Sequence, residues 1–192
     1  PFFIEAGTST YDDLNIRMYE RSSPAHNVIQ LGKKQKFNND ISWVEPIDVW
    51  SKFRAGRKAR VIHRNCGQIG KNTFWVESSH DGFRQIGVSY LRKISLTLNT
   101  DGSLTFNLID TMTASTKVYY RSFWHLGDSV SDNILNSLIK KAESKYNLIS
   151  KWENTSFAND YNLRIQRKSL VLNGLLLRGS YNFSFDFNIF PH

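Results

Sequence analysis

The residues whose side chains are best suited to catalysis or ligand binding lie early in the chain, in the stretch "RMYERSSPAHN" that ends at Asn27. His26 follows a proline and an alanine, and its imidazole could bind a metal ion or relay a proton. The amide of Asn27 could orient a sugar or a carboxylate beside it. The alternative is a hydrogen-bonded structural histidine, because no partner residue is visible next to His26 in the sequence. His26 is therefore a candidate whose role depends on what the fold brings next to it.

Arg17, Tyr19 and Arg21 occupy alternate positions a few residues earlier. Alternate side chains of a β-strand point to one face, so a strand here would present two guanidinium groups and a phenol together. Guanidinium groups bind carboxylates and sulfates through paired hydrogen bonds, which suits an acidic ligand. The alternative is an ordinary exposed face that carries long side chains.

The remaining histidines give weaker signals. His80 is followed by Asp81 and a glycine that permits a tight bend, but adjacent strand residues point to opposite faces and do not form a His–Asp pair automatically. His63 and His125 lie among apolar, aromatic or basic neighbours and fit either a core or a surface position. The signatures of serine hydrolases, kinases, nucleotide-binding loops and zinc metalloproteases are missing from the sequence.

The elements that must position these residues show the two-residue period of strands. Residues 94–110, "ISLTLNTDGSLTFNLID", alternate apolar and polar residues on both sides of Asp101-Gly102, which predicts a tight hairpin. The segments "KARVIHRN" and "NTFWVESSH" predict a second neighbouring pair of strands. The final segment "YNFSFDFNIF" places Phe183, Phe185, Phe187 and Ile189 on one face of a strand. Residues 2–6 predict a further strand, and Gly7 a turn after it.

One segment has helical spacing instead. Between Ser131 and Asn147, apolar residues recur three and four positions apart, and Ser131 or Asp132 could cap the helix. A second short helix is predicted in "EPIDVWSKF", residues 45–53. Many strands and few helices predict a mainly β fold, an antiparallel two-layer β-sandwich with one or two short helices, formed as a single domain over residues 1–192.

Charge points to an acidic partner. The 192 residues carry a formal net charge of +8, which favours nucleic acid, an anionic polysaccharide or an anionic membrane surface, or reflects a solvated basic surface. The aromatic residues mostly alternate as core positions, which argues against a nucleic-acid module. The single cysteine, Cys66, excludes an internal disulfide framework, and no apolar run is long enough for a membrane span. Because the chain starts "PFFIEAG" without Met, we expect a fragment of a longer protein.

Several motifs occur in an order that resembles a known family. They are "IEAGTSTY", "RMYERSSPAHNVIQLGKKQ", "SHDGF" followed by "GVSYLRKISL", then "LIDTM" and "YYRSFWHLGDS". This order is similar to that of the C-terminal β-sheet domain of heparinase II/III-like polysaccharide lyases, over roughly the first 128 residues. The stretch "RSSPAHNVIQLGKKQ" is the most specific part of the resemblance.

The resemblance implies a design and a reaction. An N-terminal helical toroid, upstream of this chain, would pack on the β-sandwich, with an acidic polysaccharide in the groove between them. The reaction would be β-elimination at a uronic acid, in which the uronate carboxylate is neutralised, a base removes the C5 proton and an acid assists the leaving oxygen. The family's catalytic tyrosine and its neutralising asparagine or histidine belong to the toroid. Export to the periplasm or secretion is the location that the resemblance favours.

The resemblance also implies a metal site at His26. This residue matches the histidine of the family's Ala-His-Asn motif, a zinc ligand in metal-containing members. Glu5 stands where the family has a ligating aspartate, and it could ligate zinc or another divalent metal with a different reach. The third ligand, an upstream histidine, is absent, so the site would be incomplete in this chain.

Groove residues follow from the same comparison. Tyr19 and Arg21 match the family's Tyr/Arg segment, and Arg17 and Asn27 are further substrate-binding candidates beside them. His80 matches the His-Asp-Gly element, for which we expect a structural or groove-edge role. His26 and Tyr19 are the candidates for catalysis.

Two departures from the family pattern keep a second hypothesis open. Glu5 replaces the aspartate, and Ser23-Pro24 stands where the family tends to have a threonine. The alternative function is therefore a non-catalytic carbohydrate-binding or scaffold domain of a glycan-processing protein.

Overall fold

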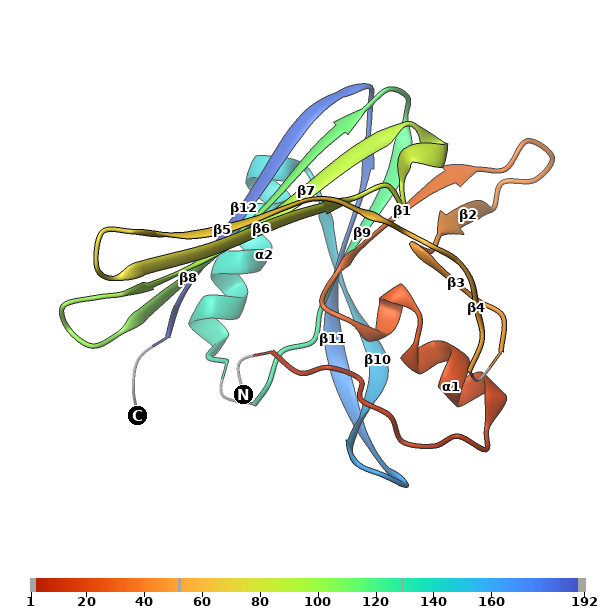
Figure 1. The fold of residues 1–192 in the computed structure, drawn as a ribbon, viewed down its shortest axis with the longest axis horizontal. Helices are drawn as coiled ribbons and strands as arrows, with labels where there is room; N and C mark the ends of the chain where they lie inside the picture. Colours follow the sequence, from red (N-terminus) through yellow and green to blue (C-terminus); the bar gives the residue numbers. More distant parts are fainter. Residues whose placement is uncertain (1–2, 52, 129, 190–192) are drawn as a thin grey trace. The chain divides into compact units, whose positions relative to one another are not determined.

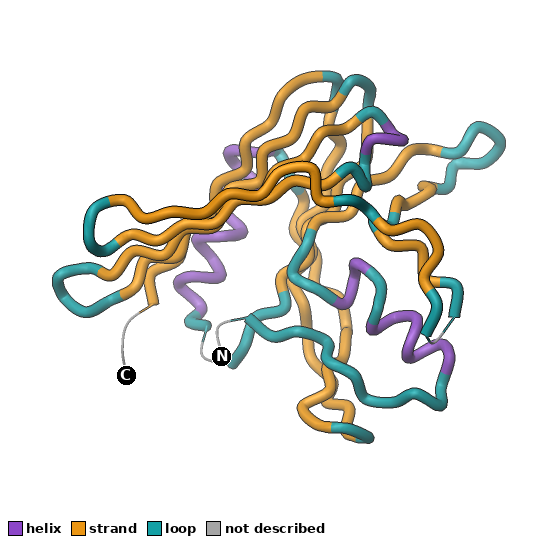
Figure 2. Tube along the Cα trace, in the orientation of Figure 1, coloured by secondary structure: helices purple, strands orange, loops and turns teal. Residues whose placement is uncertain are grey.

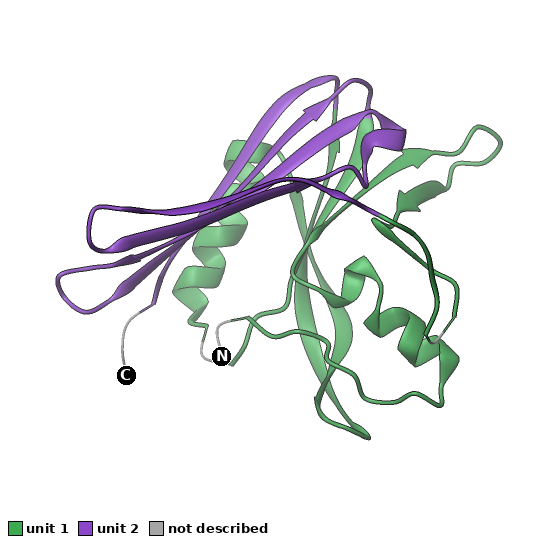
Figure 3. Ribbon diagram, viewed as in Figure 1, with its two compact units in different colours: residues 1–58, 118–176 green, residues 59–117, 177–192 purple. Residues whose placement is uncertain are grey.

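The computed structural model describes residues 3–51, 53–128 and 130–189. Its elements form two compact units that alternate along the chain, shown in green and purple in Figure 3. Unit 1 consists of Pro1–Lys58 and Val118–Leu176, and unit 2 consists of Ala59–Lys117 and Leu177–His192. Each unit therefore combines segments that are far apart in the sequence.

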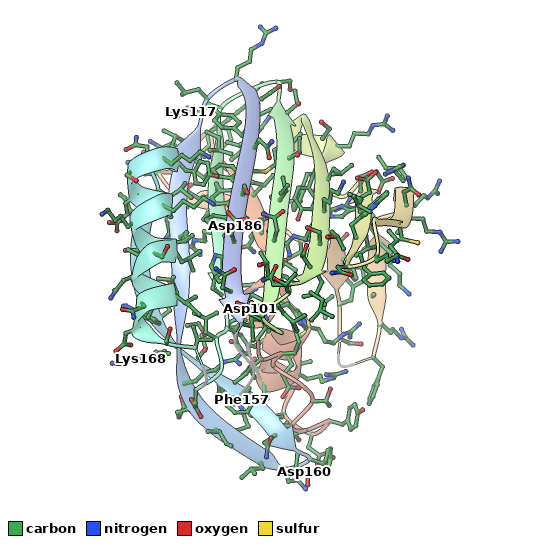
Figure 4. All side chains as sticks on the ribbon, turned by 90° about the vertical axis from the view of Figure 1, so that its left-hand side faces the viewer. Asp101, Lys117, Phe157, Asp160, Lys168 and Asp186 are labelled. Atoms are coloured by element: carbon green, nitrogen blue, oxygen red, sulfur yellow. The ribbon has the colours of Figure 1, made fainter. Side chains whose placement is uncertain are left out.

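Unit 1 is built on a five-stranded antiparallel sheet with the strand order β10-β11-β9-β1-β2. Its strands are β1 (Ile29–Lys34), β2 (Ile41–Val44), β9 (Val118–Trp124), β10 (Ile149–Asp160) and β11 (Leu163–Leu176). Buried residues lie opposite one another where the central strands pair, as Leu31 on β1 does with Tyr120 on β9. Asp160 lies at the turn between β10 and β11, at the lower end of Figure 4. Strands β3 (Ile47–Val49) and β4 (Ala55–Lys58) form a separate two-stranded sheet.

Unit 2 is built on a second five-stranded antiparallel sheet, with the order β12-β8-β7-β6-β5. Its strands are β5 (Val61–Ile69), β6 (Thr73–His80), β7 (Val88–Leu98), β8 (Leu104–Ala114) and β12 (Gly179–Ile189). The hairpins β5–β6 and β7–β8 are the yellow and green pairs of Figure 1, and Asp101 and Lys117 lie just beyond the two ends of β8 in Figure 4. A short 3-10 helix, η2 (Arg84–Ile86), connects β6 to β7.

The predicted hairpins are confirmed in unit 2. Ile94 is paired with Leu108 and Leu96 with Phe106, so the apolar residues of both strands share one face, as their alternation predicts. β5 and β6 pair as expected. On β12 the side chains of Phe183, Phe185 and Phe187 are buried, which confirms the C-terminal strand.

A partly buried ion pair lies within unit 2. Asp110 on β8 is fully buried and receives two hydrogen bonds from the Arg92 guanidinium, at 2.7 and 2.8 Å. The hydroxyl of Tyr90 donates a third bond to it at 2.7 Å. A buried carboxylate is tolerated only where such partners compensate its lost hydration, so these three residues form one structural group.

Two α-helices and one further 3-10 helix complete unit 1, in purple in Figure 2. Helix α2 (Asp132–Tyr146) confirms the predicted helix: the side chain of Ser131 caps it, and Leu138 and Ala142 are buried. Helix α1 (Leu14–Glu20) is followed by η1 (Ser23–Ala25). No helix of the described residues is long and apolar enough to cross a membrane.

Two local predictions are wrong. The helix predicted in residues 45–53 is replaced by β3, because the alternating Ile47 and Val49 pair with β4; position 52 of this segment lies outside the described residues. The strand predicted at residues 2–6 is reduced to an isolated bridge between Phe3 and Leu126, and position 2 is also outside the described residues. The fold class itself is confirmed, a mainly β, sandwich-like fold of antiparallel sheets with two helices.

Candidate functional site

The two residues predicted as a metal pair are in contact in unit 1. Nδ1 of His26, which follows η1, lies 2.5 Å from Oε2 of Glu5 in the N-terminal segment. A carboxylate only accepts hydrogen bonds, so Nδ1 carries the proton and donates it to Glu5. These residues, 21 positions apart in the sequence, therefore bind one another directly.

Asn27 fixes the geometry of this pair. Its amide nitrogen donates to Oε1 of Glu5 at 3.1 Å and to the main-chain oxygen of Ile4 at 3.0 Å. Its amide oxygen accepts a bond from the main-chain N–H of His125 at 2.8 Å. Asn27 thus ties the N-terminal segment to the end of β9, which gives it a positioning role in addition to the predicted contact with substrate.

His125 lies beneath this loop and is a residue that the sequence did not single out. It is fully buried, and its Nε2 lies 3.0 Å from the main-chain oxygen of Pro24. Because that oxygen can only accept, Nε2 carries the proton, and Nδ1 accepts from the Ser169 hydroxyl at 2.5 Å. Burial is the main cause that lowers the pKa of His125 to about 4, so the ring is neutral at pH 7.

The electrostatics of the Glu5–His26 pair favour its charged form. Burial alone would raise the pKa of Glu5, but hydrogen bonds from His26 and Asn27 and the charge of His26 outweigh it and lower the pKa to about 2. The hydrogen bond to Glu5 raises the pKa of His26, against the opposing effect of burial, and the main chain of Glu20 adds to the rise. Both pKa shifts favour the ionised forms of the two groups, an imidazolium beside a carboxylate.

A cavity of about 490 Å³ opens beside this pair. Its lining includes Glu5, Thr8, Arg17, Glu20, Arg21 and His26. It therefore brings together four residues that the sequence singled out: the metal pair and both arginines.

Arg17 is held in place within this cavity. Its Nη1 donates to Oγ1 of Thr8 at 3.0 Å and forms an ion pair with Oε2 of Glu20 at 3.4 Å. Glu20 is buried, and its other oxygen accepts from the main chain and the hydroxyl of Ser9, at 2.7 and 2.5 Å. This buried carboxylate therefore has a full set of donors and orients Arg17.

The strand predicted for Arg17, Tyr19 and Arg21 is wrong. Asp13 caps helix α1 by accepting a bond from the main-chain N–H of Ile16 at 3.1 Å, so Arg17 and Tyr19 are helical and Arg21 is the C-terminal cap. Residues four apart share a helix face, whereas residues two apart do not. The helix therefore brings the two arginines to the cavity and turns Tyr19 away from them.

Tyr19 is not among the lining residues of this cavity. Burial raises the pKa of Tyr19, against the opposing charges of Arg167 and Arg164. Arg21 donates from Nη1 to the main-chain oxygen of Ser51 at 2.6 Å. Of the predicted groove residues, the two arginines are thus placed at the cavity and Tyr19 is not.

His80 belongs to unit 2, at the end of β6. Its Nδ1 accepts the main-chain N–H of Gly82 at 3.1 Å, and its ring contacts Phe83 and Tyr90 with centroid distances of 5.2 and 5.4 Å. Burial lowers the pKa of His80, Asp81 opposes this and Arg92 adds to it. His80 lines a different cavity, which contains residues of unit 2 only.

The donor set at Glu5 and His26 does not fit a complete metal centre. Zinc is usually held by four ligands, or by three protein ligands and water. Among residues 3–51, 53–128 and 130–189 there is no cluster of three His, Cys, Asp or Glu side chains that could hold a metal ion. The Nδ1 proton of His26 is also committed to Glu5, which places the carboxylate in the orienting role that a neighbour of a ligand usually has.

Sequence reasoning missed three groups that support the site: His125, Glu20 and Glu45. Glu45 accepts from the main chain and the hydroxyl of Ser23 at 2.9 and 2.5 Å, and from Gln30. Glu20 had a usable signal, since it follows Arg17 by three positions, the spacing of helical ion pairs. The contacts of His125 and Glu45 depend on the pairing of distant segments and have no local signal.

Comparisons with known proteins agree with this architecture. The family model described as Heparinase II/III-like, C-terminal matches residues 1–177. No curated protein matches the chain. Among solved structures, the heparan sulfate lyase HepC from Pedobacter heparinus is similar with a TM-score of 0.64 and 15% identity, and the Heparinase III-BT4657 gene product with methylated lysines has a TM-score of 0.64 and 12% identity.

Both structural matches cover 98% of this chain and 28% of the other chain. At these identities the likeness shows a shared fold, and the chain spans little more than a quarter of the length of those proteins. The family match, by contrast, extends over most of the chain and includes the Glu5–His26 site. The chain therefore belongs to the heparinase II/III-like family, of which it matches the C-terminal part.

Proposed function

We propose that this chain is the C-terminal β domain of a longer polysaccharide lyase that cleaves a uronic-acid-containing polysaccharide by β-elimination. The observation that carries the proposal is the family match over residues 1–177. The cavity with Arg17, Arg21 and the Glu5–His26 pair supports it, because it presents cationic groups of the kind that bind acidic sugars. The net charge of +8 supports the same class of substrate.

The proposed roles follow from the arrangement of the side chains. Arg17 and Arg21 attract the carboxylate groups of the polysaccharide to the cavity. His26, kept protonated by Glu5, donates a hydrogen bond or a proton on the substrate side, while Asn27 holds Glu5 in position. The base that removes the C5 proton and the group that neutralises the uronate come from a helical toroid upstream of this chain.

A divalent metal ion such as zinc would require changes at this pair. It would replace a proton on His26 and take further ligands from outside the described residues. When bound, the metal would supply positive charge near the uronate carboxylate, in addition to the neutralising group of the toroid. The residues of this chain would then orient it through Glu5 and Asn27, as the hydrogen bonds now orient His26.

The test is a lyase assay on the full-length protein with a panel of acidic polysaccharides. Ultraviolet absorbance of the unsaturated uronate product reports β-elimination. His26→Ala is expected to lower kcat/KM by about 10²–10⁴-fold, the usual contribution of a positioned acid or base. His63→Ala is the matched control, because His63 also pairs with a carboxylate, Glu77 at 3.0 Å, but lies on strand β5 outside this cavity.

Three outcomes are informative. Activity that collapses only in His26→Ala supports both the lyase and the role of His26. Activity that is equal in both variants keeps the lyase but assigns His26 to structure. The 192-residue chain alone is expected to show no turnover, and measurable turnover by it would contradict the upstream placement of the base.

The alternative is a carbohydrate-binding or scaffold domain without catalysis. The replacement of the family's aspartate by Glu5 favours it, since Glu5 is committed to His26 and Asn27. A folded full-length protein that binds acidic polysaccharide and releases no unsaturated product on any of them would establish this alternative.

A further inference from the structure

Unit 2 contains a cavity of about 770 Å³ that shares no residue with the Glu5–His26 cavity. It is bounded by the end of β6, the following turn, and neighbouring positions of β7, β8 and β12. The polar groups that matter for its chemistry come from His80, Arg84, Ser89, Thr113, Arg178 and Ser180. Its volume lies within the range of ordinary ligand sites, roughly 300–1,000 Å³.

Two cationic groups of this cavity have no internal partner. Among the residues that the structure describes, the guanidinium groups of Arg84 and Arg178 make no hydrogen bond and no ion pair. The carboxylate that lines the cavity, Asp81, accepts a bond from the main-chain N–H of Arg60 at 2.7 Å. Positive charge therefore exceeds negative charge in the cavity, which suits an anion.

His80 adds a neutral hydrogen-bond donor. Because Nδ1 accepts the N–H of Gly82 at 3.1 Å, the proton of the neutral ring lies on Nε2. His80 lines the same cavity as the two arginines, so its N–H group is a third donor group available to a ligand there, and it carries no negative charge that would repel an anion.

A row of hydroxyl groups crosses the sheet at the same cavity. Thr113 on β8 is paired with Ser89 on β7 and with Ser180 on β12, so the three side chains project from one face. The hydroxyls of Thr113 and Ser180 are 3.2 Å apart. Hydroxyl groups both donate and accept, and a row of them can follow the hydroxyls of a sugar.

We propose that this cavity binds an acidic sugar unit of a glycan, with Arg84 and Arg178 on its carboxylate or sulfate group and the hydroxyl row along its sugar ring. The anionic nature of the ligand rests on the charges of the cavity. Its identity as a glycan rests on the function proposed above. The site gives the chain a second contact with a long acidic polysaccharide, within unit 2 and built from residues other than those of the Glu5–His26 cavity.

The experiment measures binding to the 192-residue chain by calorimetry, with four probes. They are a sulfated uronic-acid tetrasaccharide, an unsulfated uronic-acid tetrasaccharide, a neutral tetrasaccharide and inorganic sulfate. Arg84→Gln and Arg178→Gln remove one charge each, and Arg64→Gln is the matched control, an exposed arginine on β5 that does not line the cavity. Each cavity variant is expected to bind the acidic tetrasaccharides about tenfold more weakly than the unaltered chain does. The control variant is expected to bind them less than about twofold more weakly.

The probes separate the possible sources of the anion. Tighter binding of the sulfated than of the unsulfated acidic probe assigns a sulfate, equal binding assigns the carboxylate, and either result supports the site. Equal binding of the neutral probe, or equal loss in the Arg64→Gln control, overturns it. Amide chemical shifts of the unaltered chain provide a second readout: acidic probes should shift residues 80–89, 111–115 and 178–181, and shifts confined to other residues overturn the site.

This test is independent of turnover. If the cavity variants lost binding and the full-length protein had no lyase activity, the proposed reaction would be contradicted and the proposed site supported. Lyase activity with binding unaffected by Arg84→Gln and Arg178→Gln would keep the reaction and remove the site.

Discussion

Acid is expected to destabilise the chain through His125, the buried ring beneath the candidate site. Its pKa is about 4 in the folded chain, against 6.5 for an ordinary histidine. Between these values the unfolded chain binds a proton that the folded chain does not, so the free energy of unfolding falls as the pH is lowered. At roughly 1.4 kcal/mol per pKa unit, the full effect is about 3 kcal/mol. The stabilisation is complete above pH 6.5 and is lost as the pH falls toward 4.

The test compares urea unfolding of the unaltered chain and of His125→Gln at intervals from pH 7.5 to 4. Glutamine keeps an N–H group that can donate to Pro24, but it does not titrate. The variant is therefore expected to be less stable at pH 7, because packing changes, and to show a shallower loss toward pH 4. The comparison isolates His125 because His80, the other histidine whose pKa is lowered, is retained in both proteins.

Other groups change the free energy of unfolding in the opposite direction or over a different pH range. The raised pKa of His26 gives stability that is present below pH 6.5 and is lost as the pH rises through its folded pKa. Glu5, with a pKa of about 2, loses its contribution only as the pH falls below its ordinary value of 4.5. His63→Gln, an exposed position, serves as the control. If the free energy of unfolding fell equally steeply with pH in the unaltered chain and in His125→Gln, the assignment of the acid effect to His125 would be refuted.

Three further changes test the structure around the sites. Glu5→Gln should lower the pKa of His26 toward 6.5, because it removes the charged acceptor; an unchanged value in an NMR titration of the imidazole would contradict the pair. Asp110→Asn should cost about 3–5 kcal/mol in urea unfolding, since it leaves the partly buried guanidinium of Arg92 without its charged partner, and a cost below about 1 kcal/mol would argue against that group. Gly87→Ala should destabilise more than Gly102→Ala in thermal unfolding: both have positive φ, but only at Gly87 would the added Cβ meet another side chain, and equal losses would contradict this.

The sheets of this chain could be predicted because their signal is local. Alternation along β7, β8 and β12 is imposed by one buried face, so Phe183 or Leu108 can be assigned to that face without knowledge of its partner. The cap residue Ser131 likewise predicts the start of α2 from the local sequence, because its side chain accepts the N–H of Ile134, three positions later. Local agreement between pattern and burial is what makes such elements readable from one sequence.

Helix α1 shows where local reading fails. The alternation of Arg17, Tyr19 and Arg21 fits a strand, and nothing in these three residues distinguishes it from a short helix. The deciding feature is Asp13, whose side chain accepts the N–H of Ile16 and starts the helix. The consequence is chemical: the helix puts the two arginines, four residues apart, on one face and turns the tyrosine away.

The contacts inside the site could not be derived from the residues alone. Glu5 and His26 were placed together only through the family resemblance, because 21 residues separate them. The position of His125 depends on β9 pairing with both β1 and β11, which brings it between Pro24 and Ser169. Such contacts follow from tertiary pairing, which no single segment encodes.

The carboxylates around the Glu5–His26 cavity have partners within the protein, which is compatible with the acidic polysaccharide that we propose as its ligand. Glu5 is neutralised by His26, and Glu20 is satisfied by Arg17 and by two bonds from Ser9. Glu45 receives internal donors in the same way, from Ser23 and Gln30. Each carboxylate thus has donors within the protein and orients a loop, a helix or a histidine, while the side chain of Glu5 itself remains 58% exposed. The chain as a whole keeps a net charge of +8, the sign that the proposed polyanionic ligand requires.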